Sequence, residues 1–325
     1  MRKHLWVGLM ILSTIFLVAC DNSGVVMPEV KGQEVSMTQQ ELDELVSEAV
    51  LEQAESLTTI LEMNMEVSVN ASGSGATMSA TTKVNISGKQ GVKEEGDNIE
   101  LVSDMKMDLV MKMDMNDETL TDITNNSTIG FYYIDQTAYV NINQTMKGTS
   151  AGINIQDNLT RKTYREMSLT QVFQDYVDAI GIGDQIEMGS SFEDLIANNA
   201  SFDFKVYKDG ERYSIVYEFD SDQLLEQLDG VGLIEDSGIS FGNLGESIGQ
   251  FIVIIENDKV VDAGVNIKLD LNITVNELGA VGTGKIKLTM KARYTTDASQ
   301  YPALPSDLDS YDYDQDGTFG FDDLL

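Results

Sequence analysis

The sequence has almost no histidine, cysteine or tryptophan. Its single residues of these types are His4, Cys20 and Trp6, all within the first twenty positions. Ser–His–Asp and Cys–His catalysis need an imidazole beside the nucleophile, and structural zinc sites are built from histidine and cysteine. A single cysteine also cannot form a disulfide within the chain. The sequence therefore predicts a protein that acts by binding and is not an enzyme.

Positive charge is also scarce. The 325 residues include 54 acidic and 21 basic side chains, which gives a formal net charge of −33. Residues 1–19 hold two of the basic residues and none of the acidic ones, so the chain from Cys20 onward carries 19 − 54 = −35. A field of this sign repels the phosphates of nucleic acids and favours solubility and cation binding. We therefore exclude a nucleic-acid partner.

The first twenty residues have the pattern of an export signal. Arg2 and Lys3 precede an apolar run from Leu5 to Val18. The segment Leu17-Val18-Ala19-Cys20 resembles the lipobox of bacterial lipoproteins. This resemblance implies that residues 1–19 are removed as a signal peptide and that a diacylglycerol group on Cys20 holds the protein at the extracytoplasmic face of the cell membrane. The alternative is a short transmembrane anchor with an incidental cysteine, although the apolar run is shorter than the ~20 residues that span a bilayer.

The chain beyond the signal divides into three predicted parts. Residues 20–36 contain Gly24, Pro28 and Gly32 without periodicity and are expected to form the lipidated N-terminus and a flexible tether. Residues 37–295 are predicted to form a single domain, and residues 296–325 an acidic C-terminal tail.

Residues 37–295 show helical periodicity at first and then strand periodicity. Thr38 and Glu41 have capping-box spacing, and apolar residues at helical spacing predict a helix that ends near Leu61. Alternation then predicts strands, most clearly over 99–115. Helical patterns return at 169–180, 191–199 and 224–228, and hairpin patterns occupy 202–219 and 251–294. Hairpin-type connections predict an antiparallel sheet.

The order of lipobox, tether, amphipathic helix, meander, helical interruption and second meander is similar to the LolA/LppX-like lipoprotein-carrier superfamily. This resemblance covers residues 38–295. It implies an α+β fold in which a strongly curved antiparallel sheet, an incomplete barrel, has helices packed on its concave face. It also implies an apolar cavity between sheet and helices that holds lipid acyl chains.

Methionines are concentrated on the apolar side of the predicted strands. Methionine is unbranched and polarizable, so a surface lined with it can adapt to ligands of irregular shape. The same pattern fits an ordinary sheet core, and thioethers also suit copper(I). The candidate ligand-binding residues are Met63, Met65, Met105, Met107, Met111, Met113 and Met115.

The C-terminal tail contains one loop with the ligand spacing of a calcium site. Counted from Asp312, the spacing matches an EF-hand loop and resembles a dockerin repeat, with Gly317 at the sharp turn. The candidate metal ligands are Asp312, Asp314, Asp316, Thr318 and Asp323. Calcium is therefore the candidate cofactor, and a solvated acidic tail is the alternative.

Together these patterns predict a monomeric, lipid-anchored surface protein that binds a lipid or another hydrophobic ligand. The alternative is a structural or interaction lipoprotein at the cell surface, with a filled core and a calcium-dependent tail. The two differ in whether apolar strand faces remain accessible, and periodicity alone does not distinguish a filled core from a lined cavity.

Overall fold

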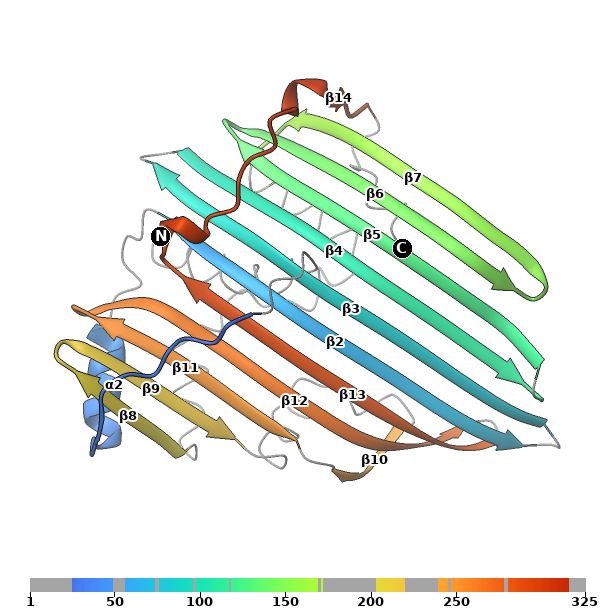
Figure 1. The fold of residues 1–325 in the computed structure, drawn as a ribbon, viewed down its shortest axis with the longest axis horizontal. Coiled ribbons are helices and arrows are strands. Elements are labelled where there is room, and N and C mark those ends of the chain that lie inside the picture. The colour runs from blue at the N-terminus through green and yellow to red at the C-terminus, as the bar shows by residue number, and fades with distance from the viewer. Residues whose placement is uncertain are drawn as a thin grey trace.

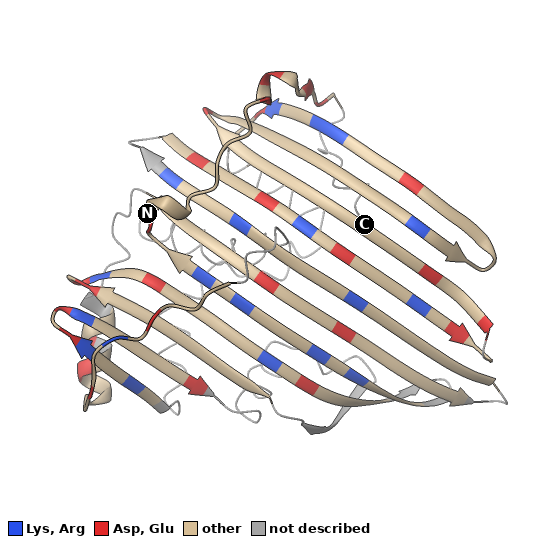
Figure 2. Cartoon of the chain, in the orientation of Figure 1, with Lys and Arg blue, Asp and Glu red and all other residues tan. Residues whose placement is uncertain are grey.

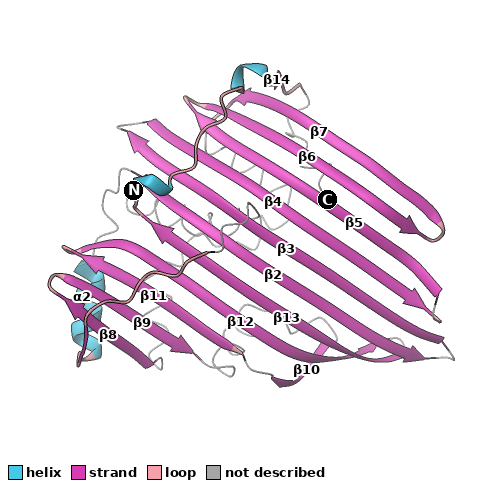
Figure 3. Ribbon diagram, viewed as in Figure 1, coloured by secondary structure: helices cyan, strands magenta, loops and turns pink. Residues whose placement is uncertain are grey.

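The structure is a computed structural model that describes residues 25–48, 56–73, 76–95, 98–116, 118–168, 171, 203–219, 239–244, 247–277 and 280–315. Nearly all of these residues belong to one 14-stranded sheet (Figure 1, Figure 3). Its first half consists of β2 (Ser56–Gly73), β3 (Ala76–Glu95), β4 (Asn98–Met115), β5 (Glu118–Ile134), β6 (Thr137–Ser150) and β7 (Ile153–Glu166). The second half consists of β8 (Asp203–Asp209), β9 (Arg212–Phe219), β10 (Ile239–Leu244), β11 (Ile248–Glu256), β12 (Lys259–Glu277) and β13 (Ala280–Thr295). Two short strands, β1 (Gln33–Val35) and β14 (Asp312–Tyr313), lie at the edges.

The two predicted meanders join edge to edge. The strand order is β1-β8-β9-β11-β12-β13-β2-β3-β4-β5-β6-β7-β14, with β10 paired to β12 outside this path. Pairing of β13 with β2 makes the halves one continuous sheet. The pairing is antiparallel, as predicted, except for the parallel pair of β14 with β7.

Hairpin turns fall where the sequence predicts them. Asp135 and Gln136 have φ angles of 47° and 60°, and Asn257 and Asp258 have φ angles of 51° and 58°. Left-handed conformations at both central residues are typical of type I′ turns, whose twist matches that of the flanking strands. The predicted long strand is also confirmed, because β4 contains 18 residues, or ~60 Å at 3.3 Å per residue.

Alternation gives the central strands two different faces. The apolar face carries the cross-strand row Met290–Met63–Ile86–Met107. The polar face carries rows of alternating charge, among them Asp270–Lys287–Glu66–Lys83, and charged positions recur along these strands in Figure 2. Lys83 Nζ lies 3.3 Å from Glu66 Oε1. Such opposite-charge neighbours stabilise the pairing of adjacent strands.

The longest helix among the described residues is α2 (Gln39–Glu48), with 10 residues. Its capping box is confirmed, since the Thr38 amide donates to Glu41 Oε2 at 2.7 Å and the Glu41 amide donates to Thr38 Oγ1 at 3.3 Å. Leu42 is completely buried in a cluster with Val206 and Ile215. The helix thus covers the apolar face of β8 and β9, behind them in Figure 1.

The predicted fold class, an α+β fold with helices packed on the concave face of a strongly curved sheet, is wrong. The described chain is nearly all strand. Part of the error lies at Leu57, Ile60 and Leu61, which fit helical spacing but belong to β2. Thr58, Thr59 and Ile60 are β-branched and favour a strand, and β2 gains ladders with both β3 and β13. The predicted helices at 169–180, 191–199 and 224–228 lie outside the described residues, apart from Gln171.

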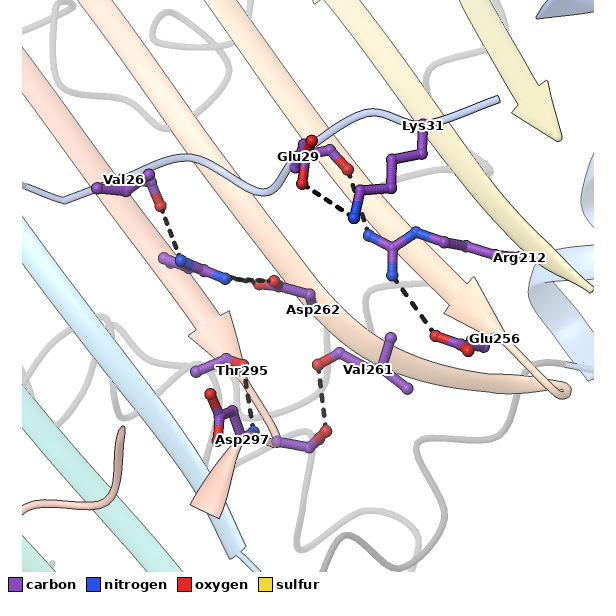
Figure 4. A network of polar contacts seen from close by, with 11 residues as sticks. Val26, Glu29, Lys31, Arg212, Glu256, Val261, Asp262, Thr295 and Asp297 are labelled. Carbon is purple, nitrogen blue, oxygen red and sulfur yellow. Dashed lines mark hydrogen bonds and ion pairs between the residues drawn. The ribbon is translucent and has the colours of Figure 1, made fainter. Parts of the chain in front are cut away.

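Residues 25–32, predicted as part of the flexible tether, lie against the polar face as an N-terminal strap that leads into the edge strand β1. Arg293 Nη1 donates to the Val26 carbonyl, and Arg212 Nη2 donates to the Glu29 carbonyl, both at 3.2 Å (Figure 4). Arg293 also makes two bonds to the Asp262 carboxylate, at 2.7 and 3.0 Å. The strap passes so close to β12 that a Cβ on Gly264 would lie 2.4 Å from a Pro28 carbon.

Residues 296–315 form a C-terminal strap over the upper part of the same face (Figure 1). A Cβ on Gly91 would lie 2.5 Å from the Tyr301 ring and 2.6 Å from Pro302. Tyr311 is buried against Val102 and Tyr132. The first part of the predicted acidic tail is therefore held by apolar and aromatic contacts with the sheet.

Candidate functional site

The predicted methionines share the apolar face of the sheet. Met63 and Met65 lie on β2, and Met105, Met107, Met111, Met113 and Met115 lie on β4. The strand β3 runs between them and places Ile86 between Met63 and Met107. The sequence pattern therefore identified a real common face, although the two groups of methionines are separated by one strand.

The register adds methionines that the sequence reasoning did not select. Met290 on β13 is the cross-strand partner of Met63, and Met78 on β3 is the partner of Met115. Met146 on β6 is the partner of Asn125 on β5. Each occupies the apolar phase of its strand, so the signal was present, but assigning these residues to the same face required the strand order.

Burial changes along this face from one end to the other. Where β2 begins, Leu57, Val92, Leu101 and Phe131 are all buried. Toward the far ends of β2 and β4 the side chains are only partly covered, and Met111 and Met115 are 37% and 39% exposed. The apolar face is therefore buried at one end and forms a partly exposed, methionine-lined surface at the other.

A row of polar side chains crosses the buried end of the apolar face. Tyr294 on β13, Thr59 on β2, Gln90 on β3 and Ser103 on β4 are successive cross-strand partners. We call these four residues the polar seam. The sequence reasoning missed them, although Ser103 interrupts the apolar series from Leu101 to Met115 and so carried a signal.

Three residues of the polar seam are almost fully buried, and Tyr294 is partly buried. Thr59 and Ser103 are each 2% exposed and Gln90 is 3% exposed. Burial raises the pKa of Tyr294 to about 12, because desolvation disfavours the phenolate. The phenol is thus protonated at neutral pH and can donate a hydrogen bond. The seam offers hydroxyl groups and an amide, which suits binding of a neutral polar group.

The structure places two of the five predicted calcium ligands. Asp312 belongs to the extended strand β14, and Asp314 is buried with its Oδ1 3.1 Å from Arg161 Nη2. Asp314 would have to leave Arg161 to bind calcium. Asp316, Thr318 and Asp323 lie outside the described residues, as does Cys20. No group of three or more His, Cys, Asp or Glu side chains suited to a metal occurs in the described part of the chain, and calcium binding stays a prediction.

No protein-family model matches the chain, and no curated protein matches it. Among solved structures, a β-barrel-like protein of a domain of unknown function from Brucella abortus is 7% identical, with a TM-score of 0.15 over 70% of this chain and 97% of that chain. The outer membrane protein OprG from Pseudomonas aeruginosa is 10% identical, with a TM-score of 0.16 over 82% of this chain and 99% of that chain. OpdQ from Pseudomonas aeruginosa is 8% identical, with a TM-score of 0.15 over 74% and 99%. Similarities this weak carry no argument about fold or function.

Proposed function

We propose that this protein is a lipid-anchored protein of the cell surface that binds a lipid or another hydrophobic ligand on the methionine-lined part of its apolar face. The anchor in this proposal is Cys20, and the ligand surface is the open end of β2, β3 and β4. Among the described residues, no helix is both long and apolar enough to cross a membrane.

The observation that carries the proposal is the exposure of Met111 and Met115 at the methionine-lined end of this face. Full burial of a methionine side chain is worth about 1.5–3 kcal/mol. At 37% and 39% exposure, each of these two side chains leaves roughly a third of that gain, about 0.5–1 kcal/mol, for a ligand to provide. Met113 lies between them on the same face and is partly exposed, and neighbouring apolar side chains that form an exposed patch can mark a binding site.

The chemistry of the surface favours a flexible apolar ligand. Val84 and Ile86 belong to β3. Their cross-strand partners on the two neighbouring strands include Met63, Met65 and Met107. Thioether side chains have several rotatable bonds and polarizable sulfurs, so they can repack around chains of different length. The competing function, a structural or interaction lipoprotein, would need no accessible apolar face.

Binding can be tested with diphenylhexatriene, a neutral apolar probe that fluoresces when it leaves water. The purified protein is expected to bind it saturably. Met111→Glu places a carboxylate on the apolar face, and burying that charge against the probe is costly, so the affinity should fall at least tenfold, about 1.4 kcal/mol.

The matched control is Val110→Glu, which adds the same charge at the adjacent residue of β4. Val110 is the cross-strand partner of Lys83 and so lies on the polar face. This variant should bind the probe within about twofold of the unmodified protein. Absence of saturable binding, or equal loss in the two variants with their folds intact, would reject the proposal.

A further inference from the structure

The polar seam contains a hydrogen-bond acceptor that the protein leaves unused. The side-chain oxygen of Gln90 is buried and has no hydrogen-bond partner in the described structure. Leaving such a group desolvated and unpaired costs about 1–3 kcal/mol. Buried polar groups are nearly always paired, so an unpaired one needs an explanation.

A second polar pair on the same face shows the contrast. Asn125 and Ser127 are 6% and 1% exposed, and Ser127 Oγ donates to Asn125 Oδ1 at 3.2 Å. These side chains satisfy each other within β5. Gln90 lies between its cross-strand partners Thr59 and Ser103, yet its side-chain oxygen accepts no hydrogen bond from either of them, and a ligand can supply the missing donor.

The composition of the seam selects the class of ligand. Tyr294, Thr59, Gln90 and Ser103 are all uncharged, and no lysine or arginine belongs to this row. A carboxylate or phosphate bound there would be buried without a counter-charge, which is strongly unfavourable. A hydroxyl group, in contrast, can donate to Gln90 without burying a charge.

The distance from the seam to the methionines matches a single hydrocarbon chain. From Gln90 the apolar positions of β3 continue through Ile86 to Val84, six residues or ~20 Å further along the strand. An acyl chain that spans one leaflet covers roughly half of the ~30 Å hydrocarbon core. A chain with its head at Gln90 therefore covers about four to five residues of β3 and ends near Ile86, between its partners Met63 and Met107.

We infer that the polar seam binds the hydrogen-bond-donating head of a neutral single-chain amphiphile, such as a long-chain alcohol, whose tail lies on the methionine-lined part of the apolar face. This inference rests on the proposed function, since it names the ligand class for the same face. It adds a defined head-group site and an orientation, with the head at the buried end and the tail toward the open end.

The test compares hexadecanol with hexadecyl methyl ether as competitors of diphenylhexatriene on the full chain. The ether has the same tail but cannot donate a hydrogen bond. The unmodified protein should bind the alcohol about tenfold more tightly, and Gln90→Met should bring this ratio close to one while leaving the affinity for the ether unchanged. The matched control is Gln250→Met, which makes the same change on the polar face of β11, where Gln250 Nε2 donates to Glu218.

The outcomes separate the two proposals. Equal affinity for alcohol and ether in the unmodified protein, a comparison that needs no variant, overturns the head-group site while the proposed function stands. A preference for the alcohol that survives Gln90→Met overturns it as well. Failure of both competitors and of the probe to bind overturns the proposed function and this inference together.

Discussion

The ion pair between Arg161 and Asp314 should control whether the end of the C-terminal strap stays on the sheet. Arg161 Nη2 lies 3.1 Å from Asp314 Oδ1, and the side chains of Arg161 and Asp314 are 22% and 0% exposed. Beside this pair the Asp314 amide donates to the Tyr164 carbonyl at 2.9 Å. Arg161→Gln removes the charge of the partner and leaves the carboxylate in place.

The size of the effect follows from the distance and the burial. Two unit charges 3.1 Å apart attract by about 5 kcal/mol at an effective dielectric constant of ~20. Desolvation offsets most of this attraction, and the partial exposure of Arg161 reduces it further, so the net coupling should be about 1–3 kcal/mol. Because the strap can detach without unfolding the sheet, the loss should be local.

Hydrogen exchange at the Asp314 amide measures this local opening directly. Arg161→Gln should speed exchange there by roughly 5- to 150-fold, at 1.4 kcal/mol per factor of ten. Asp314→Asn and the double variant complete a cycle that isolates the pair. The exposed pair Lys106 and Asp108 serves as a control, with an expected coupling below about 1 kcal/mol. Unchanged exchange at Asp314 in Arg161→Gln, or a coupling no larger than that of the control pair, would refute this reasoning.

Three further predictions concern other parts of the chain. Gly91→Ala should displace Tyr301 and Pro302, whose atoms lie 2.5 and 2.6 Å from the new Cβ position, and so speed exchange in residues 301–311; unchanged exchange would contradict this contact. Tyr294 has a pKa of about 12 instead of its ordinary 10.0. The protonated phenol therefore stabilises the folded state fully below pH 10, and this stabilisation is lost as the pH rises through 12. As the pH rises from 9 to 12, the Tyr294→Phe variant should therefore lose about 2 kcal/mol less free energy of unfolding than the unmodified protein, measured by urea titration. Equal losses in the two proteins would count against a buried phenol. Cys20→Ser should release the protein from membranes on fractionation with its fold intact, and retention in the membrane would contradict lipidation at Cys20.

The regular part of the sheet could be read from the sequence because strand periodicity is a local property. Alternation at Met105, Met107 and Met111 predicts β4 and its apolar side, and the predicted turns at Asp135-Gln136 and Asn257-Asp258 are where the strands reverse. The polar side of β12 and β13 was also predictable, since the lysines of β13 lie across from Asp270: Lys287 is its cross-strand partner, and Lys285, diagonal to it, forms an ion pair of 2.7 Å with it.

The arrangement of the sheet depends on contacts between residues far apart in the chain. At the start of β2 the local signals conflict, because Leu57, Ile60 and Leu61 fit helical spacing while the β-branched residues favour a strand. The ladders with β3 and β13 decide between the two. Docking of the straps likewise depends on Gly91 and Gly264, which leave room for Tyr301 and Pro28. A glycine inside a strand often marks such a close approach, and this signal was present in both strands.

The candidate site was predictable in part for the same reason. The methionines of β2 and β4 follow from alternation, but the polar seam exists only because four strands bring Tyr294, Thr59, Gln90 and Ser103 into one row. Whether the face is filled or open depends on burial, which differs between Leu101 and Met115 on the same strand.

The most direct test of ligand binding on the methionine-lined surface is the rate of methionine oxidation by hydrogen peroxide, with and without saturating diphenylhexatriene. Oxidation follows exposure of the thioether, and Met111 and Met115 are the exposed methionines among the described residues. We expect bound diphenylhexatriene to slow formation of the sulfoxide at Met111 and Met115 several-fold and to leave the oxidation rate of Met37, which packs beside α2, unchanged. Equal oxidation rates at Met111 and Met115 with and without the probe would contradict binding on this surface.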